Sequence, residues 1–167
     1  MIRHAPLAGL LLAAAALSGC GLRPLYADGG KGSVAQSLSQ IEVAPIPGQA
    51  GWLVRNAVSD RMAAGGSGEK RYRLEIELDD QLTGFGVRRD NAVTRERRTL
   101  RARYRLVDGA TVVLDATAGS DAGIDVVSSE YATIAAEQTA LENLAQQIAD
   151  QIVTRLALYA KRTQAEQ

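Results

Sequence analysis

The sequence contains very little histidine and cysteine. Its 167 residues include one histidine, His4, and one cysteine, Cys20. A domain that begins after these positions has no imidazole and at most one thiol, which excludes Ser-His-Asp and Cys-His catalysis, most zinc sites and internal disulfides. Asp121 and Asp125 lie near glycines, but they lack the spacing of a calcium-binding EF-hand. We therefore predict a protein that is not an enzyme and that needs no metal or cofactor.

The chain also lacks an excess of charge of either sign, and aromatic residues make up only 4% of it. Domains that bind nucleic acid are normally clearly basic, so a formal net charge of +0 argues against that function. Hydrophobic residues account for 46%, which is too many for a disordered chain. The length fits one folded domain.

Residues 1–19 have the pattern of a secretory signal peptide: a short basic start, a central apolar run and small residues at the end. The apolar run is shorter than the roughly 20 residues that a membrane span requires. The sequence Leu17-Ser18-Gly19-Cys20 is similar to a bacterial lipobox, in which the cysteine is acylated and becomes the mature N-terminus. The alternative is an ordinary signal peptide with a cysteine there by chance. We predict lipidation at Cys20.

Residues 20–37 are rich in glycine, serine and alanine, so we expect the lipidated N-terminus to continue as a tether. Acyl chains on a terminal cysteine hold a protein firmly, since two membrane-binding signals already give stable anchoring. Gly21 is not the aspartate that many Gram-negative lipoproteins use to stay in the inner membrane. We therefore expect a lipid-anchored protein on the periplasm-facing side of the outer membrane.

Residues 38–162 are predicted to form a single α+β domain, and residues 163–167 a disordered tail. The expected fold has two helices packed on one face of a four-stranded, mostly antiparallel sheet, in the order β-α-β-β-β-α. Trp52 is predicted to anchor the start of the first helix against the core. The predicted elements are a strand over Leu38–Ile46, a helix over Trp52–Ala64, strands over Arg71–Leu82 and Thr94–Val107, a fourth, interrupted strand over Ala110–Leu114 and Ile124–Val127, and a long helix from Ser129 to Arg162.

Two of the predicted strands alternate strictly between apolar and charged residues. In Arg71–Leu82 the even positions from 72 to 78 are apolar and the odd positions from 71 to 79 are charged. Thr94–Val107 repeats the pattern, with apolar residues at the even positions from 100 to 106 and arginine at most odd positions. This alternation is typical of a strand with one buried face. Two glycines and an Asp-Asn pair between the strands favour a long hairpin with a projecting tip.

Positive charge is concentrated in this hairpin. Residues 88–105 hold eight arginines and two acids, whereas residues 106–154 hold eight acids and no lysine or arginine. One interpretation is that the arginines bind phosphate, such as that of a lipid headgroup, because the guanidinium group pairs with phosphate through two hydrogen bonds. The other is a ladder of ion pairs across the hairpin. In such a ladder the arginines at 101, 103 and 105 face Asp79, Glu77 and Glu75.

The ladder is the favoured interpretation for the arginines from 101 to 105. At the hairpin tip and its flank the sequence offers fewer acidic partners, and there both interpretations stay open. The candidate glycolipid-binding residues are Arg88, Arg89, Arg95, Arg97 and Arg98.

Several short motifs occur in an order that spans nearly the whole chain after residue 19. They are Cys20-Gly21-Leu22-Arg23-Pro24-Leu25-Tyr26, Tyr72-Arg73-Leu74-Glu75-Ile76, Arg103-Tyr104-Arg105-Leu106-Val107-Asp108, Tyr131-Ala132 followed by Ala135-Ala136-Glu137, and Ile152 through Leu156. In this order they resemble the LPS-assembly lipoprotein family LptE, in the form found in alphaproteobacteria.

The resemblance implies a partner and a function. Members of this family lie inside the large outer-membrane β-barrel LptD, assist its assembly and help deliver lipopolysaccharide to the outer leaflet, without catalysis. The resemblance also implies that a basic residue at the hairpin tip contacts glycolipid, and Arg88 and Arg89 occupy that tip here. In the family a second basic residue lies near the start of the last helix. This chain has no lysine or arginine from 106 to 154, so that contact is either missing or supplied by another part of the chain. The alternative function is an adaptor lipoprotein of another envelope transport complex, with no glycolipid contact.

Overall fold

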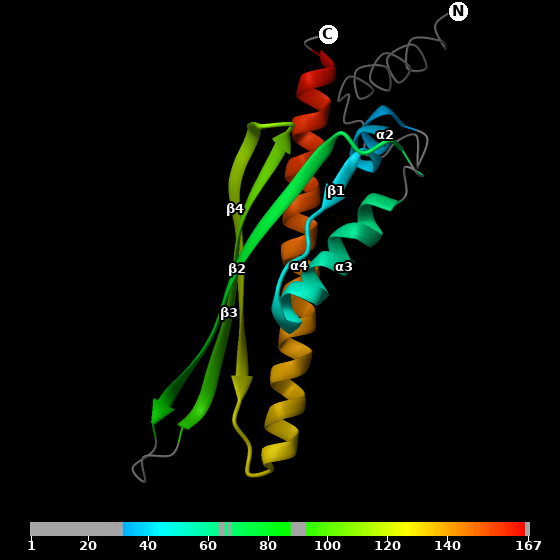
Figure 1. The fold of residues 1–167 in the computed structure, drawn as a ribbon. Coiled ribbons are helices and arrows are strands. Elements are labelled where there is room, and N and C mark those ends of the chain that lie inside the picture. The colour runs from blue at the N-terminus through cyan, green and yellow to red at the C-terminus, as the bar shows by residue number, and fades with distance from the viewer. Residues whose placement is uncertain (1–31, 64–65, 67, 88–92, 166–167) are drawn as a thin grey trace, which may run out of the picture.

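A four-stranded sheet with helices on one face organises the chain (Figure 1). The computed structural model describes residues 32–63, 66, 68–87 and 93–165. The helices and strands are α2 (Ser33–Ser39), β1 (Ile41–Val43), α3 (Gly48–Met62), β2 (Tyr72–Val87), β3 (Val93–Asp108), β4 (Thr111–Asp125) and α4 (Glu130–Ala165).

The sheet has the order β1-β2-β3-β4, with β1 parallel to β2 and the other two pairings antiparallel. Glu75 lies opposite Arg105, and Asp79 lies opposite Arg101. This register is the one expected for a hairpin centred near residue 90. The predicted fold class, an α+β fold with a mostly antiparallel sheet, is confirmed.

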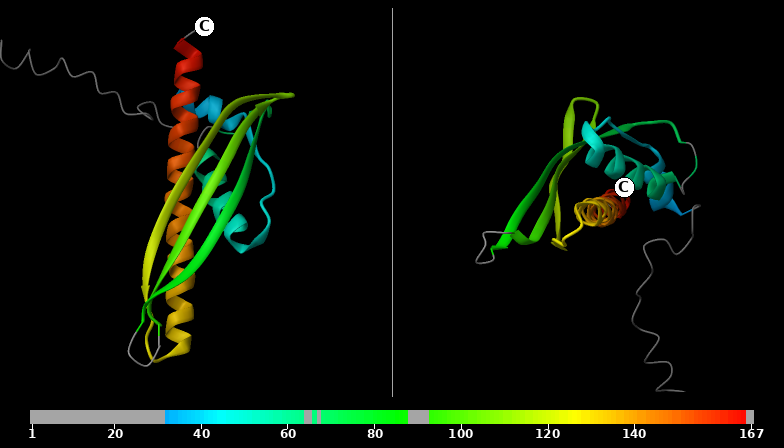
Figure 2. Two further views of the ribbon diagram at one scale, coloured as in Figure 1. Left: turned by 90° about the vertical axis from the view of Figure 1, so that its left-hand side faces the viewer. Right: turned by 90° about the horizontal axis from the view of Figure 1, so that it is seen from below.

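The core lies between the inner face of the sheet and the helices α3 and α4. Figure 2 shows both helices on the same side of the sheet, with the strands crossing α4 obliquely. The even positions of β2 and β3 point inward, as their alternation predicts, and Leu74 in β2 is fully buried. From α4, the buried stripe runs through Leu141, Leu144, Ile148 and Ile152. With 36 residues, α4 is roughly 54 Å long, and it spans the length of the sheet.

Three boundaries differ from the prediction because packing or proline overrides the local pattern. Helix α2 begins at Ser33, inside the range expected to be tether, because Ala35 and Leu38 are buried in the core. Strand β1 covers only three residues, since the chain turns away at the two prolines that follow it. At the other end, residues 163–165 continue α4 instead of forming a tail, and Gln164 donates hydrogen bonds to α2.

The fourth strand is continuous, and the interruption predicted between residues 114 and 124 is wrong. Strand β4 runs from Thr111 to Asp125 and pairs with β3 along its length, with one bulge at Leu106/Val107. Alanines and glycines in this stretch have low strand propensity, but pairing with the neighbouring strand outweighs it. The finding matters for the candidate site, because β4 brings aspartates beside the arginines of β3.

Trp52 is 62% exposed, so the prediction that it anchors α3 against the core is wrong. The helix begins at Gly48, four residues earlier than expected, and Gly51 occupies the buried position. A Cβ atom at Gly51 would lie 2.5 Å from the backbone oxygen of Ile46, so only glycine permits this close approach. Trp52 is thereby turned to the surface.

Candidate functional site

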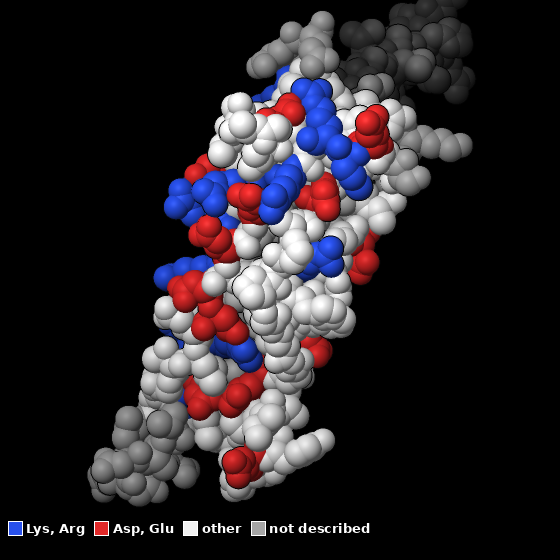
Figure 3. All heavy atoms as spheres, viewed as in Figure 1, with Lys and Arg blue, Asp and Glu red and all other residues white. Residues whose placement is uncertain are grey.

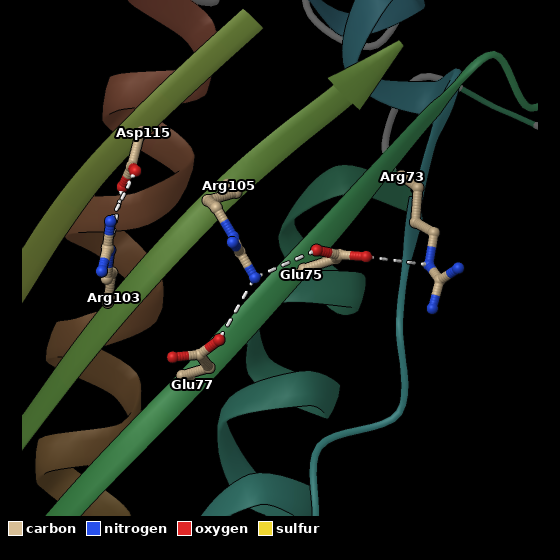
Figure 4. Close-up of polar contacts among 6 residues, drawn as sticks. All are labelled: Arg73, Glu75, Glu77, Arg103, Arg105 and Asp115. Atoms are coloured by element: carbon tan, nitrogen blue, oxygen red, sulfur yellow. Dashed lines mark hydrogen bonds and ion pairs between the residues drawn. The ribbon is translucent and has the colours of Figure 1, made fainter. Parts of the chain in front are cut away.

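The outward arginines of β3 form ion pairs with acids on both neighbouring strands (Figure 4). The guanidinium of Arg105 lies 3.5 Å from Glu75 and 3.2 Å from Glu77 of β2. Arg103 instead pairs with Asp115 of β4, at 2.9 Å. Of the three predicted ion pairs, only the one between Arg105 and Glu75 is formed, and Arg103 takes its partner from the other side.

These pairs are exposed, so each contributes little to stability, in the usual range of about 0–1 kcal/mol. The hydrogen bond from Arg103 holds the pKa of Asp115 below its ordinary value. Arg101 forms no ion pair with any residue that the structure describes. Figure 3 shows the result on one face, where positive and negative side chains alternate along the strands. The ladder accounts for most of this charge as ordinary sheet surface.

On the flank of the hairpin, Arg95 and Arg97 also have acidic partners. Arg95 pairs with Asp125 at 3.0 Å, and Arg97 lies 3.6 Å from Asp121. The guanidinium carbon of Arg97 is also 5.4 Å from the centre of the Phe85 ring. The expectation that acids are scarce here is wrong because both aspartates lie on β4, in or beside the stretch where the sequence predicts an interruption.

Arg98 differs from its neighbours because it lies on the inner face of the sheet. It forms two hydrogen bonds to the carboxylate of Asp80, at 2.9 and 2.7 Å, and a third to the backbone oxygen of Glu137 in α4, at 3.1 Å. Its side chain is 17% exposed and that of Asp80 is 24% exposed. Arg98 therefore joins β2, β3 and α4, and this bonding leaves it poorly placed for a ligand.

The remaining predicted residues, Arg88, Arg89 and the lipidation site Cys20, lie outside the described residues. In the sequence, the two arginines fall between the end of β2 and the start of β3.

Next to Arg98 lies a carboxyl group that the sequence analysis missed. Glu96 occupies an inward position of β3, and its Oε2 atom is out of contact with solvent and has no hydrogen-bond partner among the described residues. This burial raises the pKa of Glu96 above its ordinary value of 4.5, and so does the neighbouring carboxylate of Glu137, because its negative charge favours the protonated form and it can accept a hydrogen bond from that form. The strict alternation of β3 already places residue 96 on the inner face, and that signal was available in the sequence.

Replacing Glu96 with glutamine is expected to stabilise the protein at neutral pH. A raised carboxyl pKa means that the folded state binds the proton more tightly, so stability falls as the pH rises from about 4.5 through the raised pKa. Glutamine keeps the shape without the charge. Thermal melts of both proteins between pH 4 and pH 8 should therefore diverge as the pH rises, with the higher Tm for Glu96→Gln.

Glu69→Gln is the control, since Glu69 is exposed and forms no ion pair within the described residues. Melting curves of Glu96→Gln and the parent that stay parallel across the whole pH range would contradict the assignment.

The hairpin end of the molecule exposes several large apolar side chains. They come from β2, from the loop before α4 and from the first turns of α4, and they are Leu82, Phe85, Val127, Tyr131 and Ile134. Ile134 continues the stripe of α4 that is buried further along the helix, so the apolar stripe extends beyond the part that α3 covers. An apolar surface of this kind is typical of a contact with another protein or with lipid.

The described residues contain no group of three histidine, cysteine, aspartate or glutamate side chains that could hold a metal ion. None of the helices in the described part of the chain is both long and apolar enough to cross a membrane.

A comparison with known families shows the family to which the chain belongs. The family model LptE, described as lipopolysaccharide-assembly, matches residues 38–156. The chain belongs to the LptE family. The resemblance that its motifs indicate is thereby confirmed, and the match covers β1, α3, the whole hairpin, β4 and most of α4.

Solved structures of bacterial lipoproteins share this LptE fold. A lipoprotein from Caulobacter crescentus CB15 is 28% identical, with a TM-score of 0.66 over 79% of this chain and 98% of that one. The rare lipoprotein B from Shewanella oneidensis is 10% identical, with a TM-score of 0.58 over 76% and 98% of the two chains. The minor lipoprotein from Acinetobacter baumannii is 12% identical, with a TM-score of 0.59 over 72% and 92%. The chain has no significant sequence match among curated proteins.

The LptE family and the lipoprotein relatives support a role as a lipopolysaccharide-assembly lipoprotein. The ion pairs described above show which arginines of this LptE chain already have an acidic partner. Among the five predicted glycolipid-binding residues, Arg98 donates three hydrogen bonds within the protein. Arg95 and Arg97 form ion pairs with aspartates at the surface.

Proposed function

We propose that this chain is a non-catalytic outer-membrane lipoprotein that plugs an LptD-type β-barrel, helps that barrel to assemble and assists insertion of lipopolysaccharide into the outer leaflet. The family match over residues 38–156 is the observation that carries the proposal. The exposed apolar residues at the hairpin end support it, because a protein enclosed by a barrel needs a surface that tolerates loss of water.

We propose that arginines of the hairpin contact glycolipid, and we divide them into primary and secondary contacts. Arg88 and Arg89 are the primary contacts, since only Asp90 is an acid beside them in the sequence. Arg95 and Arg97 are secondary contacts: their ion pairs are exposed and contribute little energy, so a phosphate group can replace the carboxylate. Arg98 is better explained as a structural residue that holds the hairpin to α4.

The lipid anchor is proposed at Cys20. Cys20→Ser removes the thiol that would be acylated, so the variant is expected to accumulate as an unprocessed precursor or as a periplasmic protein released from the membrane. Fractionation of the cells, with mass spectrometry of the N-terminus, measures both. Processing and membrane attachment unchanged from the parent protein would contradict the anchor. Ser18→Ala, which keeps a small residue before the cysteine, is the matched control.

Identification of the partner tests the proposed function. The tagged full-length protein, purified from outer membranes dissolved in detergent, is expected to bring with it a β-barrel of the size of a lipopolysaccharide translocon. Recovery of a complex linked to the inner membrane, without such a barrel, would instead support the adaptor function and overturn the proposal. The Cys20→Ser protein, purified in parallel, shows whether association requires the anchor.

A further inference from the structure

Strand β4 is the last strand of the sheet, and along one side its backbone has no neighbouring strand among the described residues. Gly119 shows which side that is. Its N–H group donates to the side-chain oxygen of Gln151 at 3.3 Å, and its carbonyl accepts from the side-chain nitrogen of Gln151 at 3.1 Å. The side-chain amide of Gln151, from α4, therefore occupies the place that a peptide group of a fifth strand would take.

Further backbone groups on this edge are open. Residues two apart on a strand direct their backbone groups to the same edge, and the pairing of β3 with β4 is regular from Leu114 to Asp125. The N–H and C=O groups of Asp115 and Thr117 thus point the same way as those of Gly119. No other backbone within the described residues pairs with them. An edge of this kind is a template for an extended peptide.

A groove of about 690 Å³ lies between this edge and the second half of α4. Ala116 and Thr117 line it from the strand, and Thr154 and Arg155 line it from the helix. Arg155 is exposed and has no ion pair or hydrogen bond within the described part of the chain. The acid in the groove, Asp150, already pairs with Arg61 at 2.6 Å. The groove therefore has an uncompensated positive charge.

Tyr104 lines the groove from the inner face of β3. The residue is only 2% exposed, and its hydroxyl has no hydrogen-bond partner among the described residues. The hydroxyl is not sealed in the core, because Glu96 Oε2 alone among the described side-chain atoms is both fully buried and unpartnered. Tyr104 and Arg155 line the same groove, where burial raises the pKa of Tyr104 and the positive charge of Arg155 opposes that rise. Both are hydrogen-bond donors, and together they fit a carboxylate.

We propose that this groove binds an extended acidic peptide segment of a partner protein. The segment pairs with the β4 edge at Asp115 and Thr117, and one of its carboxylates contacts Arg155 and the hydroxyl of Tyr104. The strand edge requires that the bound peptide has an extended backbone, and the unpaired guanidinium of Arg155 favours a peptide with a negative charge. This interaction needs neither the tip of the hairpin nor glycolipid, so its test is independent of the proposed function.

The test uses the full-length chain in detergent micelles and a synthetic ten-residue peptide. The peptide alternates valine with threonine and has one central glutamate, a glutamine at each end and blocked termini, so that its net charge is negative. A second peptide replaces the glutamate with glutamine. NMR then measures binding and the rate of hydrogen exchange at the Asp115 and Thr117 amides.

The glutamate peptide is expected to slow exchange at both amides, and Arg155→Gln is expected to raise its Kd about tenfold or more. The glutamine peptide should bind the parent protein as weakly as the glutamate peptide binds Arg155→Gln, because both changes remove the same contact. Tyr104→Phe keeps the buried ring and should weaken binding several-fold. Arg162→Gln, on the same helix but outside the groove, should leave binding unchanged.

Three results would overturn the proposal. Exchange at Asp115 and Thr117 that stays unchanged at millimolar peptide means that no strand adds to the edge. Binding of inorganic phosphate that depends on Arg155, without peptide binding, means that the groove is a simple anion site. Exchange that is already slow without peptide, and that becomes fast when residues 20–31 are deleted, means that the chain's own N-terminal segment occupies the groove.

Discussion

Leu74→Asp is expected to prevent the protein from folding. Leu74 is fully buried on β2, where it packs in the core between the sheet and the helices. A carboxylate at this position has no partner, and an unpaired buried charge costs several kcal/mol even after the structure relaxes. A domain of this size has a total stability of about 5–15 kcal/mol. Circular dichroism and size-exclusion chromatography should show a loss of soluble, folded monomer.

The matched control for this prediction is Leu82→Asp, the same substitution on the same strand and the same face of the sheet. Leu82 is 46% exposed, beyond the part of the sheet that α3 covers. The new carboxylate there stays hydrated, so the control variant should fold. If Leu74→Asp melted at the same temperature as Leu82→Asp, the inward register of β2 would be wrong.

Arg88→Glu combined with Arg89→Glu is expected to weaken glycolipid binding sharply. Reversal of two charges replaces attraction to phosphate with repulsion. Because the interaction is between exposed charges, the loss should shrink as salt screens it over a Debye length of about 8–10 Å. Thermal stability should change by less than about 0.5 kcal/mol, as is usual for surface substitutions. The measurement is lipopolysaccharide binding at low and high salt, alongside a thermal melt.

Arg103→Glu tests whether lipid binding depends on the arginines at 88 and 89 or on any positive charge of the hairpin. Arg103 pairs with Asp115 and lies opposite Glu77, so a glutamate there meets acids on both neighbouring strands. This variant should lose stability through like-charge repulsion and should lose less lipid binding than the double variant. If the double variant binds lipopolysaccharide as well as the parent protein does, the hairpin has no role in lipid contact and only the role toward the barrel remains.

The hairpin could be predicted from the sequence because its two strands are adjacent in the chain and alternate strictly. The two-residue period leaves only the registers that bury Leu74 and Leu100 on the same face, and the length of the connecting segment then selects the one that aligns Glu75 with Arg105. The long α4 was predictable for a similar reason, since its apolar stripe repeats at helical spacing over many turns.

The acidic partners of Arg95 and Arg97 could not be predicted in the same way. They lie on β4, whose alanines and glycines carry little strand signal and which forms by pairing with β3. The position of α2 also depends on packing, because a helix of seven residues is not stable alone and gains its stability from burial of Ala35 and Leu38. The error in β4 explains why the sequence left the flank of the hairpin without partners.

The most direct test of the central claim is the amount of lipopolysaccharide at the cell surface when this protein is depleted in the bacterium that encodes it. Surface labelling is compared with total lipopolysaccharide in the same cells. The proposed function predicts that surface lipopolysaccharide falls while the total does not, and that the parent protein restores it. The Leu74→Asp variant should fail to restore it because it does not fold, whereas Glu69→Gln, a substitution at an exposed position away from the hairpin end, should restore it. Unchanged surface lipopolysaccharide after full depletion would contradict the claim.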